Sequence, residues 1–291
     1  MAPLVVIVGE TASGKSALAL KLAEKFNGEI LSADSWTVYK GFDVGTAKPS
    51  VEEQAKIPHH LLDVADPTEG FSAVLFQRLA NKAIADIQGR GKLPILAGGT
   101  GLYIDSVVFG YSFLPPSDPA LREELNAMTL EQVLARAVEL GLDTTGIDLR
   151  NKRRVIRLIE NNGVRPSKQQ LRPDTYILGL STPREDLRAR VERRVDTMLA
   201  AGLEEEVQHL AEQYGWDAEP MKGIGYREWK EYFGGSQTLD QTRAKIIKAT
   251  MDLAKRQRTW FKRNDSIHWL NNRDKYTEAV DYLTTVLNKN N

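Results

Sequence analysis

Short apolar runs alternate with longer amphipathic segments along the first third of the chain. Residues 4–8 form a continuous β-branched apolar run, typical of a strand that is buried on both faces of a parallel sheet. Runs of similar length predict four further strands, over residues 29–32, 60–64, 93–97 and 176–180. Residues 17–26 and 71–89 carry apolar side chains at helical spacing and predict helices between the strands. The alternation predicts a doubly wound α/β fold with a parallel sheet.

The pattern changes near residue 113, where a proline-rich stretch ends the alternation. From there to about residue 170 the spacing is mainly helical. Pro183 then suits the start of a long amphipathic helix, which Gly202 ends. We therefore expect the first part of the α/β core over residues 1–112, a mainly helical insertion over 113–171, and completion of the core with basic C-terminal helices over 172–291.

Composition excludes several classes of function. The 291 residues include 39 Lys and Arg against 39 Asp and Glu, so binding of a polyanion requires local segregation of charge. The chain has no cysteine, which excludes a disulfide scaffold, a thiolate metal site and a cysteine nucleophile. It shows neither a basic leader nor an apolar run of about 20 residues, so we expect a cytoplasmic protein without membrane contact. No obligate protein partner is evident from the sequence.

The turn after the first strand matches the phosphate-binding pattern G-x-x-x-x-G-K-[ST]. It lies between a strand and a helix, where its mechanism requires it to be. Backbone amides and the helix N-terminus attract a phosphate there, Lys15 adds a full positive charge, and Ser16 can hold Mg²⁺. The pattern predicts a polyphosphate ligand and leaves open whether it is a nucleoside triphosphate or another diphosphate. The residues expected to bind it are Gly9, Thr11, Ala12, Ser13, Gly14, Lys15 and Ser16.

Two further loops follow strands at the same predicted edge of the sheet. The carboxylate of Asp34 is either a Mg²⁺ ligand or general base, or merely the cap of the next turn. Residues 98–101 (Gly-Gly-Thr-Gly) indicate close approach to a ligand, unusual dihedral angles or a tight strand-to-helix turn, and Thr100 is the hydrogen-bonding side chain among them. For His59 and His60 we expect a structural role, because no third metal ligand has a fitting spacing.

Cations gather in two segments of the chain. In residues 150–157, five cations fall within eight residues, and on a helix four of them share one face: Arg150, Arg153, Arg154 and Arg157. The second segment has Trp260 and Phe261 beside it and comprises Arg243, Lys245, Lys248, Lys255, Arg256, Arg258, Lys262 and Arg263. Such segments are either nucleic-acid sites, where aromatic rings can stack on bases, or solvated helix faces paired with acids elsewhere.

Taken together, these segments resemble the tRNA dimethylallyltransferase family, the isopentenyl-adenosine tRNA modification enzymes, in their bacterial form without a zinc finger. The resemblance covers most of the chain, with its blocks in family order. They are residues 9–16, 33–40, 43–49, 58–63, 98–103, 151–154, 193–198, 223–228 and 254–261. The set is far more specific than the phosphate loop alone.

The resemblance implies a magnesium-dependent transfer of a dimethylallyl group from dimethylallyl diphosphate to the exocyclic amine (N6) of the adenine 3′ of the tRNA anticodon. Lys15 and Mg²⁺ would neutralise the departing diphosphate. Asp34 would accept a proton from the amine, Thr100 would position donor or acceptor, and the adenine would be extruded from its stack. With the two cationic segments added, the residues expected to contact the anticodon stem-loop are Asp34, Ser35, Trp36, Thr37, Thr100, Arg122, Arg153, Arg154, Arg157, Lys222, Lys255 and Arg256.

The chain departs from the family pattern at two positions. Thr37 stands where the family has a glutamine that would read the adenine edge, and Glu10 stands where it usually has a proline. Three other functions share some features: a P-loop kinase of a small metabolite or nucleoside, an adenylate isopentenyltransferase, and a nucleotide-gated RNA-binding module. The cationic segments and the helical insertion favour tRNA over a small acceptor. Asp34 and Thr100 beside the phosphate loop argue against a module without catalysis.

Overall fold

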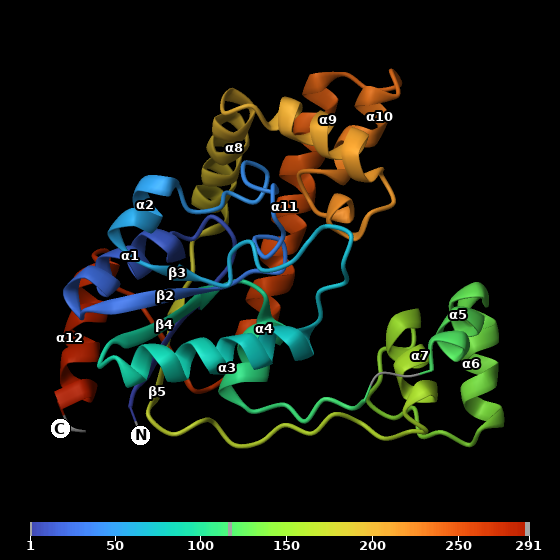
Figure 1. Cartoon of the computed structure of the whole chain (residues 1–291), viewed down its shortest axis with the longest axis horizontal. Coiled ribbons are helices and arrows are strands. Elements are labelled where there is room, and N and C mark those ends of the chain that lie inside the picture. Colours follow the sequence, from blue (N-terminus) through green and yellow to red (C-terminus); the bar gives the residue numbers. More distant parts are fainter. Residues whose placement is uncertain (1, 116–117, 289–291) are drawn as a thin grey trace. The chain divides into compact units, whose positions relative to one another are not determined.

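A six-stranded sheet forms the centre of the larger part of the molecule (Figure 1). The computed structural model describes residues 2–115 and 118–288. Neighbouring strands follow the order β3-β2-β4-β1-β5-β6, and each neighbouring pair is parallel. The strands are β1 (Leu4–Gly9), β2 (Gly28–Ala33), β3 (His59–His60), β4 (Leu93–Gly98), β5 (Thr175–Leu180) and β6 (Ile267–Trp269). The predicted parallel α/β sheet is confirmed.

Helices cover both faces of this sheet. Val5 of β1 is fully buried and belongs to a core that also contains side chains of α1 (Lys15–Lys25) and α12 (Lys275–Asn288). Helices α3 (Ala73–Gly89) and α4 (Gly101–Val108) pack against each other and against β4. Figure 1 shows α1 and α3 on either side of the strands. The central strands are continuous apolar runs because both of their faces are buried in this way.

Two strands differ from the sequence prediction. The strand expected over residues 60–64 is limited to β3, because Leu61 and Asp63 have left-handed backbone conformations, with φ of +66° and +53°. These residues turn the chain away from the sheet after two residues have paired with β2. The apolar pattern does not predict β6, since its three residues are too few to show a strand period.

A second apolar core lies among the helices that follow β5 and the segment that follows β2. Its largest fully buried side chains are those of Trp229, Tyr226 and Phe42. The core therefore holds the segment after β2 against these helices. Its elements are α8 (Arg184–Ala200), α9 (Leu203–Tyr214), α10 (Lys230–Phe233), α11 (Leu239–Phe261) and the 3-10 turns Glu219–Lys222 and Arg227–Trp229. The short helix α2 (Val51–Lys56) has no buried residue. None of the helices in the described parts of the chain is long and apolar enough to cross a membrane.

Residues Phe109–Gln170 form a separate compact unit. Leu125, Val133 and Val155, one from each of its helices, are almost completely buried in a core of their own. The helices are α5 (Pro119–Ala127), α6 (Leu130–Glu139) and α7 (Lys152–Glu160). This unit is inserted in the chain between α4 and β5.

Candidate active site at the carboxyl ends of the strands

The phosphate loop leaves β1 and turns into the first residues of α1. Gly14 has a left-handed backbone, with φ of +97°, where a side chain would be strained. The Ser13 N–H donates to the Glu10 carbonyl at 3.2 Å, and Lys15 Nζ donates to the same carbonyl at 2.7 Å. Lys15 thus folds back over its own loop beside the N-terminus of α1, where an anion is favoured.

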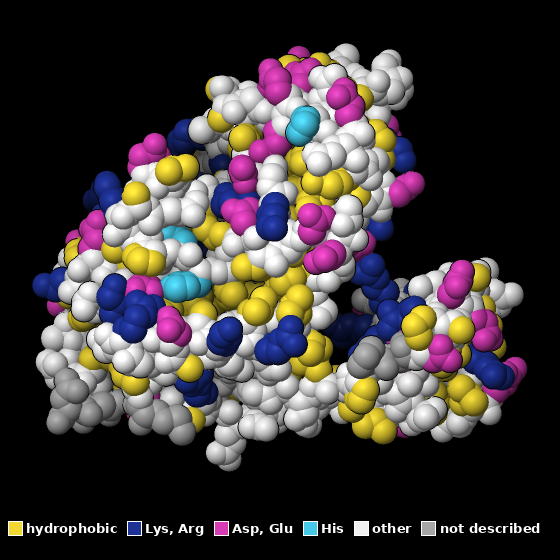
Figure 2. Space-filling model, viewed as in Figure 1, with side chains coloured by type: hydrophobic (Ala, Val, Ile, Leu, Met, Phe, Trp, Pro, Cys, Tyr) yellow, Lys and Arg dark blue, Asp and Glu magenta, His cyan; other side chains and the backbone are white. Residues whose placement is uncertain are grey.

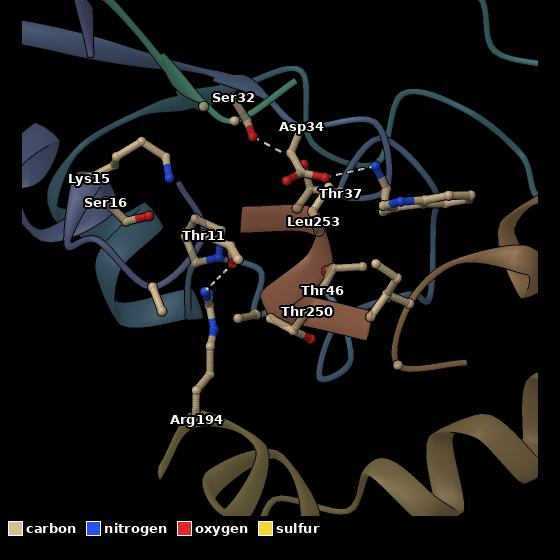
Figure 3. Close-up of a pocket in the computed structure, with 18 of the residues that line it drawn as sticks. Thr11, Lys15, Ser16, Ser32, Asp34, Thr37, Thr46, Arg194, Thr250 and Leu253 are labelled. Atoms are coloured by element: carbon tan, nitrogen blue, oxygen red, sulfur yellow. Dashed lines mark hydrogen bonds between the residues drawn. The ribbon is translucent and has the colours of Figure 1, made fainter. Parts of the chain in front are cut away.

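The loop opens into a cavity of about 510 Å³. Figure 3 shows Lys15 and Ser16, at the start of α1, and Asp34, directly after β2, pointing into the same space. The residues that were predicted to bind substrate and that line it are Thr11, Ala12, Gly14, Lys15, Ser16, Asp34, Trp36 and Thr37. Gly9 and Ser13 complete the loop without lining the cavity. Apolar side chains of α8 and α11 form another part of its wall: Val191, Val195, Met198, Ile246 and Leu253.

Two arginines of α8, to which the sequence patterns gave no role, reach the same cavity. Arg194 Nη1 donates to the Thr11 hydroxyl at 3.2 Å (Figure 3), and Arg190 Nη1 donates to the Ser13 carbonyl at 3.4 Å. The arginines are four residues apart and therefore lie on one face of the helix. Together with Lys15 they bring three cations to the phosphate loop. This charge suits a ligand that carries more than one negative charge.

The electrostatics of the cavity act most strongly on Lys15. The pKa of its ammonium is lowered to about 8, first by burial and then by the nearby Arg194 cation. The carboxylates of Asp34 and Glu10 raise this pKa, and burial outweighs them. Burial also lowers the pKa of Arg194, although a guanidinium stays charged over the whole working range of pH. Lys15 is therefore the cation whose charge depends on pH near neutrality.

We expect diphosphate binding to weaken as pH rises above about 8. The free protein then loses the Lys15 proton, whereas a bound anion favours the charged ammonium and raises its pKa. Binding at pH 9 must accordingly take up a proton, and affinity falls by up to about tenfold per pH unit. Calorimetry with inorganic diphosphate in buffers of different ionisation enthalpy measures this uptake. A Lys15→Met variant serves as the control, and equal proton uptake by both proteins would contradict the expectation.

Asp34, Ser35 and Thr100 meet where β2 and β4 end. Asp34 Oδ1 accepts the Trp36 N–H at 2.9 Å, and the same side chain lines the cavity. The capping bond therefore does not exclude a chemical role for this carboxylate. Thr100 Oγ1 accepts the Ser35 N–H at 3.1 Å and donates toward Ser35 Oγ at 3.4 Å. Thr100 thus holds the loop that carries Asp34 against the end of β4 and does not itself line the cavity.

The glycines of residues 98–101 permit close approach to protein groups. A Cβ at Gly98 would lie 2.2 Å from the Ala33 carbonyl oxygen, and a Cβ at Gly99 would lie 2.2 Å from Gln257 Nε2. None of the three glycines in this loop has a positive φ. The structure has a tightly packed strand-to-helix turn here, without unusual dihedral angles. Gly98 and Gly99 also line the cavity, so close approach to a ligand at this loop stays a prediction.

Glu10, one of the two departures from the family pattern, faces away from the phosphate side of the loop. Its buried carboxylate accepts Arg258 Nη2 and the Thr182 N–H, each at 2.8 Å. Arg258 also donates to the Thr182 carbonyl at 2.7 Å. Glu10 therefore ties the start of the phosphate loop to α11 and to the end of β5, and it neutralises a cation of the second basic segment.

Thr37, the other departure, is a buried residue in the cavity wall. Its Oγ1 lies 3.0 Å from Ser32 Oγ on β2, and the two hydroxyls share a hydrogen bond. The side chain is held close to the sheet and does not extend as a glutamine amide would. Its neighbour Trp36 lines the same cavity with a larger aromatic surface.

Ion pairs divide the cations of the second basic segment. Three of them are paired within the chain: Arg243 with Asp196, Lys245 with Glu231, and Arg258 with Glu10. The remaining five are exposed and form no ion pair with any residue in 2–115 or 118–288, and we refer to them as the α11 stripe: Lys248, Lys255, Arg256, Lys262 and Arg263. Three of the five lie on α11, and Lys262 and Arg263 directly follow its last residue. None of the five lines the cavity, but Leu253 and Gln257 of α11 do.

The cations of the Phe109–Gln170 unit are also divided. Helix α7 buries its apolar side chains against the other helices of the unit. Arg157 of α7 and Arg122 of α5 both bind the buried carboxylate of Glu160, which offsets part of their charge. Arg153 and Arg154 are exposed.

For two further cations, the expected helix position of Arg150 is wrong, and the expected tRNA contact of Lys222 stays a prediction. Helix α7 begins at Lys152, so Arg150 lies before the helix and not on its face, and it pairs with Asp148 at 3.1 Å. Lys222 lies in an exposed turn, where it pairs with Glu219 at 3.0 Å and does not line the cavity.

The paired histidines have protein partners. His59 Nδ1 lies 2.7 Å from the Ile57 carbonyl, and His60 Nε2 lies 2.7 Å from the buried Glu29 carboxylate. Among the residues that the structure describes, no group of three His, Asp or Glu side chains could hold a metal ion. A metal at the cavity would therefore need ligands from a substrate or from water.

Comparisons with known proteins agree with one another. Residues 37–264 match the family model described as IPP transferase. A tRNA dimethylallyltransferase of Roseiflexus sp. is 44% identical over 90% of this chain and 91% of its own length. One from Staphylococcus epidermidis is 40% identical over 98% of this chain and 92% of its own.

Solved structures give the same result. The crystal structure of a Staphylococcus epidermidis tRNA delta(2)-isopentenylpyrophosphate transferase superposes with a TM-score of 0.75 at 38% identity, covering 100% of both chains. A structure of a eukaryotic dimethylallyltransferase acting on tRNA superposes with a TM-score of 0.81 at 26% identity, covering 100% of this chain and 80% of that one.

Proposed function

We propose, since this chain belongs to the IPP transferase family, that it transfers a dimethylallyl group from dimethylallyl diphosphate to N6 of an adenine in tRNA. The adenine is the one directly 3′ of the anticodon, and diphosphate is released. We place the reaction in the cytoplasm, where a tRNA substrate is available.

The observation that carries this proposal is the make-up of the cavity. One side holds the phosphate loop with Lys15 and Arg194, and Asp34 points into the same space. The side chains of α8 and α11 add an apolar wall. A diphosphate joined to a short branched hydrocarbon matches a cationic side and an apolar side.

The phosphate loop would bind the diphosphate of the donor. Lys15, Arg190 and Arg194 would stabilise the negative charge that grows on the leaving oxygen as the carbon–oxygen bond breaks. The Ser16 hydroxyl lines the cavity beside Lys15 and fits the usual mode of Mg²⁺, which takes few protein ligands and completes its shell with phosphate oxygens and water. A bound Mg²⁺ would supply further neutralisation of the diphosphate.

Asp34 would act as the general base. In the transfer, N6 of the adenine forms a bond to C1 of the donor, and the C1–O bond breaks with its electron pair leaving on diphosphate. The N6 proton then passes to the Asp34 carboxylate. The Trp36 N–H bond to Oδ1 fixes the direction of this carboxylate, and Thr100 holds its loop through Ser35.

An adenine can reach this cavity only after it has left its stack in the anticodon loop. Trp36 lines the cavity and offers an aromatic surface to an extruded base, with Thr37 beside it in the wall.

The surface charges indicate which parts of the molecule could contact the tRNA backbone. On the face seen in Figure 2, acidic side chains gather over α9 and α10, where a phosphate would be repelled. We assign the contacts with tRNA phosphates to the α11 stripe and to exposed Arg153 and Arg154 of the helical unit.

The proposal is tested by offering the protein labelled dimethylallyl diphosphate with Mg²⁺ and one acceptor at a time. We expect label in unmodified tRNA and none in AMP. Label in AMP would make the protein an adenylate isopentenyltransferase. Transfer of phosphate from ATP to a small metabolite, with no alkylated product, would make it a kinase.

Replacing Lys255 and Arg256 by glutamine should weaken tRNA binding and flatten its dependence on salt. Each cation that contacts a phosphate contributes about 0.7–0.9 to the slope of log K against log [salt], so the double variant should lose about 1.5. Binding is measured at several salt concentrations. The matched control is Arg243→Gln with Lys245→Gln, on the same helix, because both of those cations are already paired. Equal slopes for the two double variants would contradict the assignment.

A further inference from the structure

One buried amide of α11 bonds to two loops of the candidate site. Gln257 Oε1 accepts the backbone N–H of Thr11 at 2.8 Å, and Gln257 Nε2 donates to the Gly99 carbonyl at 3.1 Å. The residue is only 9% exposed. Because the Thr11 N–H can only donate and the Gly99 carbonyl can only accept, these partners also fix which end of the amide is which. The amide therefore bridges the loops that follow β1 and β4.

The packing around the bridge leaves little freedom at its Gly99 end. A Cβ at Gly99 would lie 2.2 Å from Gln257 Nε2, so the carbonyl and the amide are in contact only because this residue has no side chain. The next residue of α11, Arg258, binds the phosphate loop as well, because its guanidinium pairs with the Glu10 carboxylate. The amide and the guanidinium together attach the phosphate loop to α11.

The bridge connects the two halves of the proposed reaction. Thr11 belongs to the loop that would hold the diphosphate. Gly99 directly precedes Thr100, whose hydroxyl holds Ser35 and with it the loop of Asp34. Gln257 therefore connects the phosphate loop with the loop of Asp34 through three hydrogen bonds and the peptide links that join Gly99 to Thr100 and Asp34 to Ser35.

We propose that Gln257 is a positioning residue, whose amide fixes the spacing between the donor's diphosphate and the Asp34 carboxylate. This inference rests on the proposed function. A buried, fully bonded amide of purely structural use would matter for folding alone, whereas a positioning amide matters for turnover in a protein that still folds and still binds diphosphate. Small displacements of reacting groups are costly, because a shift of about 1 Å can lower a rate by about 10²-fold.

The test replaces the amide without changing its size. Gln257→Met fills a similar volume and loses both hydrogen bonds. Gln257→Glu keeps an acceptor for the Thr11 N–H, and its ionised form has no proton for the Gly99 carbonyl. We expect both variants to lower kcat by about 10- to 10²-fold, while the Kd of inorganic diphosphate with Mg²⁺ changes by less than about threefold for Gln257→Met. The negative charge that Gln257→Glu adds beside the phosphate loop should weaken diphosphate binding as well, so the comparison of kcat with Kd is made on Gln257→Met. Gln208→Met, the same change on the exposed face of α9, is the matched control and should leave kcat unchanged.

A second variant breaks the bridge from the other side. Gly99→Ala places a methyl group against the amide nitrogen and should lower kcat by a similar factor. If the two residues act as one unit, adding Gln257→Met to Gly99→Ala should lower kcat by less than about threefold more. Thermal unfolding of each variant shows whether it folds.

The outcomes separate this inference from the function on which it rests. No transfer by the unchanged protein would overturn the proposed function and this inference together. Transfer by the unchanged protein with kcat retained in a folded Gln257→Met variant would overturn the inference alone. The inference would also fail if kcat and diphosphate affinity fell by the same factor, or if the two substitutions lowered kcat independently.

Discussion

Replacing Asp34 by asparagine is expected to lower turnover by about 10²- to 10⁴-fold, which is the range that a general base contributes. The amide keeps the size of the carboxylate and can still accept the Trp36 N–H through its oxygen. It cannot take the proton of the attacking amine. The affinity for inorganic diphosphate should not fall, because Asp34 lies across the cavity from the phosphate loop and its carboxylate repels the anion. Steady-state kinetics and calorimetry measure the two quantities.

Asp217→Asn gives a matched control, since this exposed carboxylate lies outside the cavity. It should retain full turnover. Unchanged turnover in the Asp34 variant would remove the general base from the mechanism. A large loss of diphosphate affinity would instead indicate that Asp34 acts through a bound cation.

Replacing Lys15 by methionine is expected to affect both binding and turnover. A hydrogen bond to a charged group contributes about 1.5–3 kcal/mol, so the affinity for diphosphate should fall by about 10- to 10²-fold. Turnover should fall by about 10²- to 10³-fold, because the ammonium stabilises charge that is greatest when the carbon–oxygen bond breaks. This pattern differs from that of the Asp34 variant, in which turnover alone falls.

Lys25→Met is the control, because this lysine lies on the exposed side of the same helix. Diphosphate affinity and turnover should both stay at the level of the unchanged protein. If the Lys15 variant bound diphosphate and turned over normally, the phosphate loop would not be the donor site. Retention of affinity with loss of turnover would limit Lys15 to the chemical step.

The sequence was sufficient for the parts of the molecule that depend on local pattern. The central strands are continuous apolar runs because they are buried on both faces, and this made β1, β2, β4 and β5 predictable. The phosphate loop follows from a motif whose spacing reflects its mechanism. By contrast, β3 ends early because of left-handed residues at Leu61 and Asp63, and such conformations have no apolar signature.

The residues that the sequence patterns missed are those that act through tertiary contacts. Arg190 and Arg194 reach the phosphate loop from a helix more than 170 positions away in the chain. Their spacing of four residues beside the apolar face of α8 was the available signal. Gln257 lies between Ala254 and Phe261 on the buried face of α11, and a polar residue on such a face indicates a specific partner. The partner itself could not be inferred, because no pattern relates this helix to the loops after β1 and β4.

The pairing of cations with acids was the feature that could be predicted least reliably from the sequence. Arg122 and Arg157 share a buried carboxylate, Arg243 is paired with an acid 47 positions away, and Lys245 with one 14 positions away. A count of cations in a segment cannot distinguish these from the cations of the α11 stripe. The α11 stripe emerges only when the internal ion pairs are known.

We propose that one cavity moves a five-carbon group from diphosphate onto N6 of a single tRNA adenine. The most direct measurement is a product analysis of one reaction with labelled dimethylallyl diphosphate, Mg²⁺ and unmodified tRNA. Released diphosphate is quantified, and the tRNA is digested so that the alkylated nucleoside and its position can be identified. We predict equal amounts of diphosphate and N6-dimethylallyladenosine, all of it directly 3′ of the anticodon. Diphosphate release without alkylated tRNA, or label on another atom or base, would show that the cavity does not carry out this transfer.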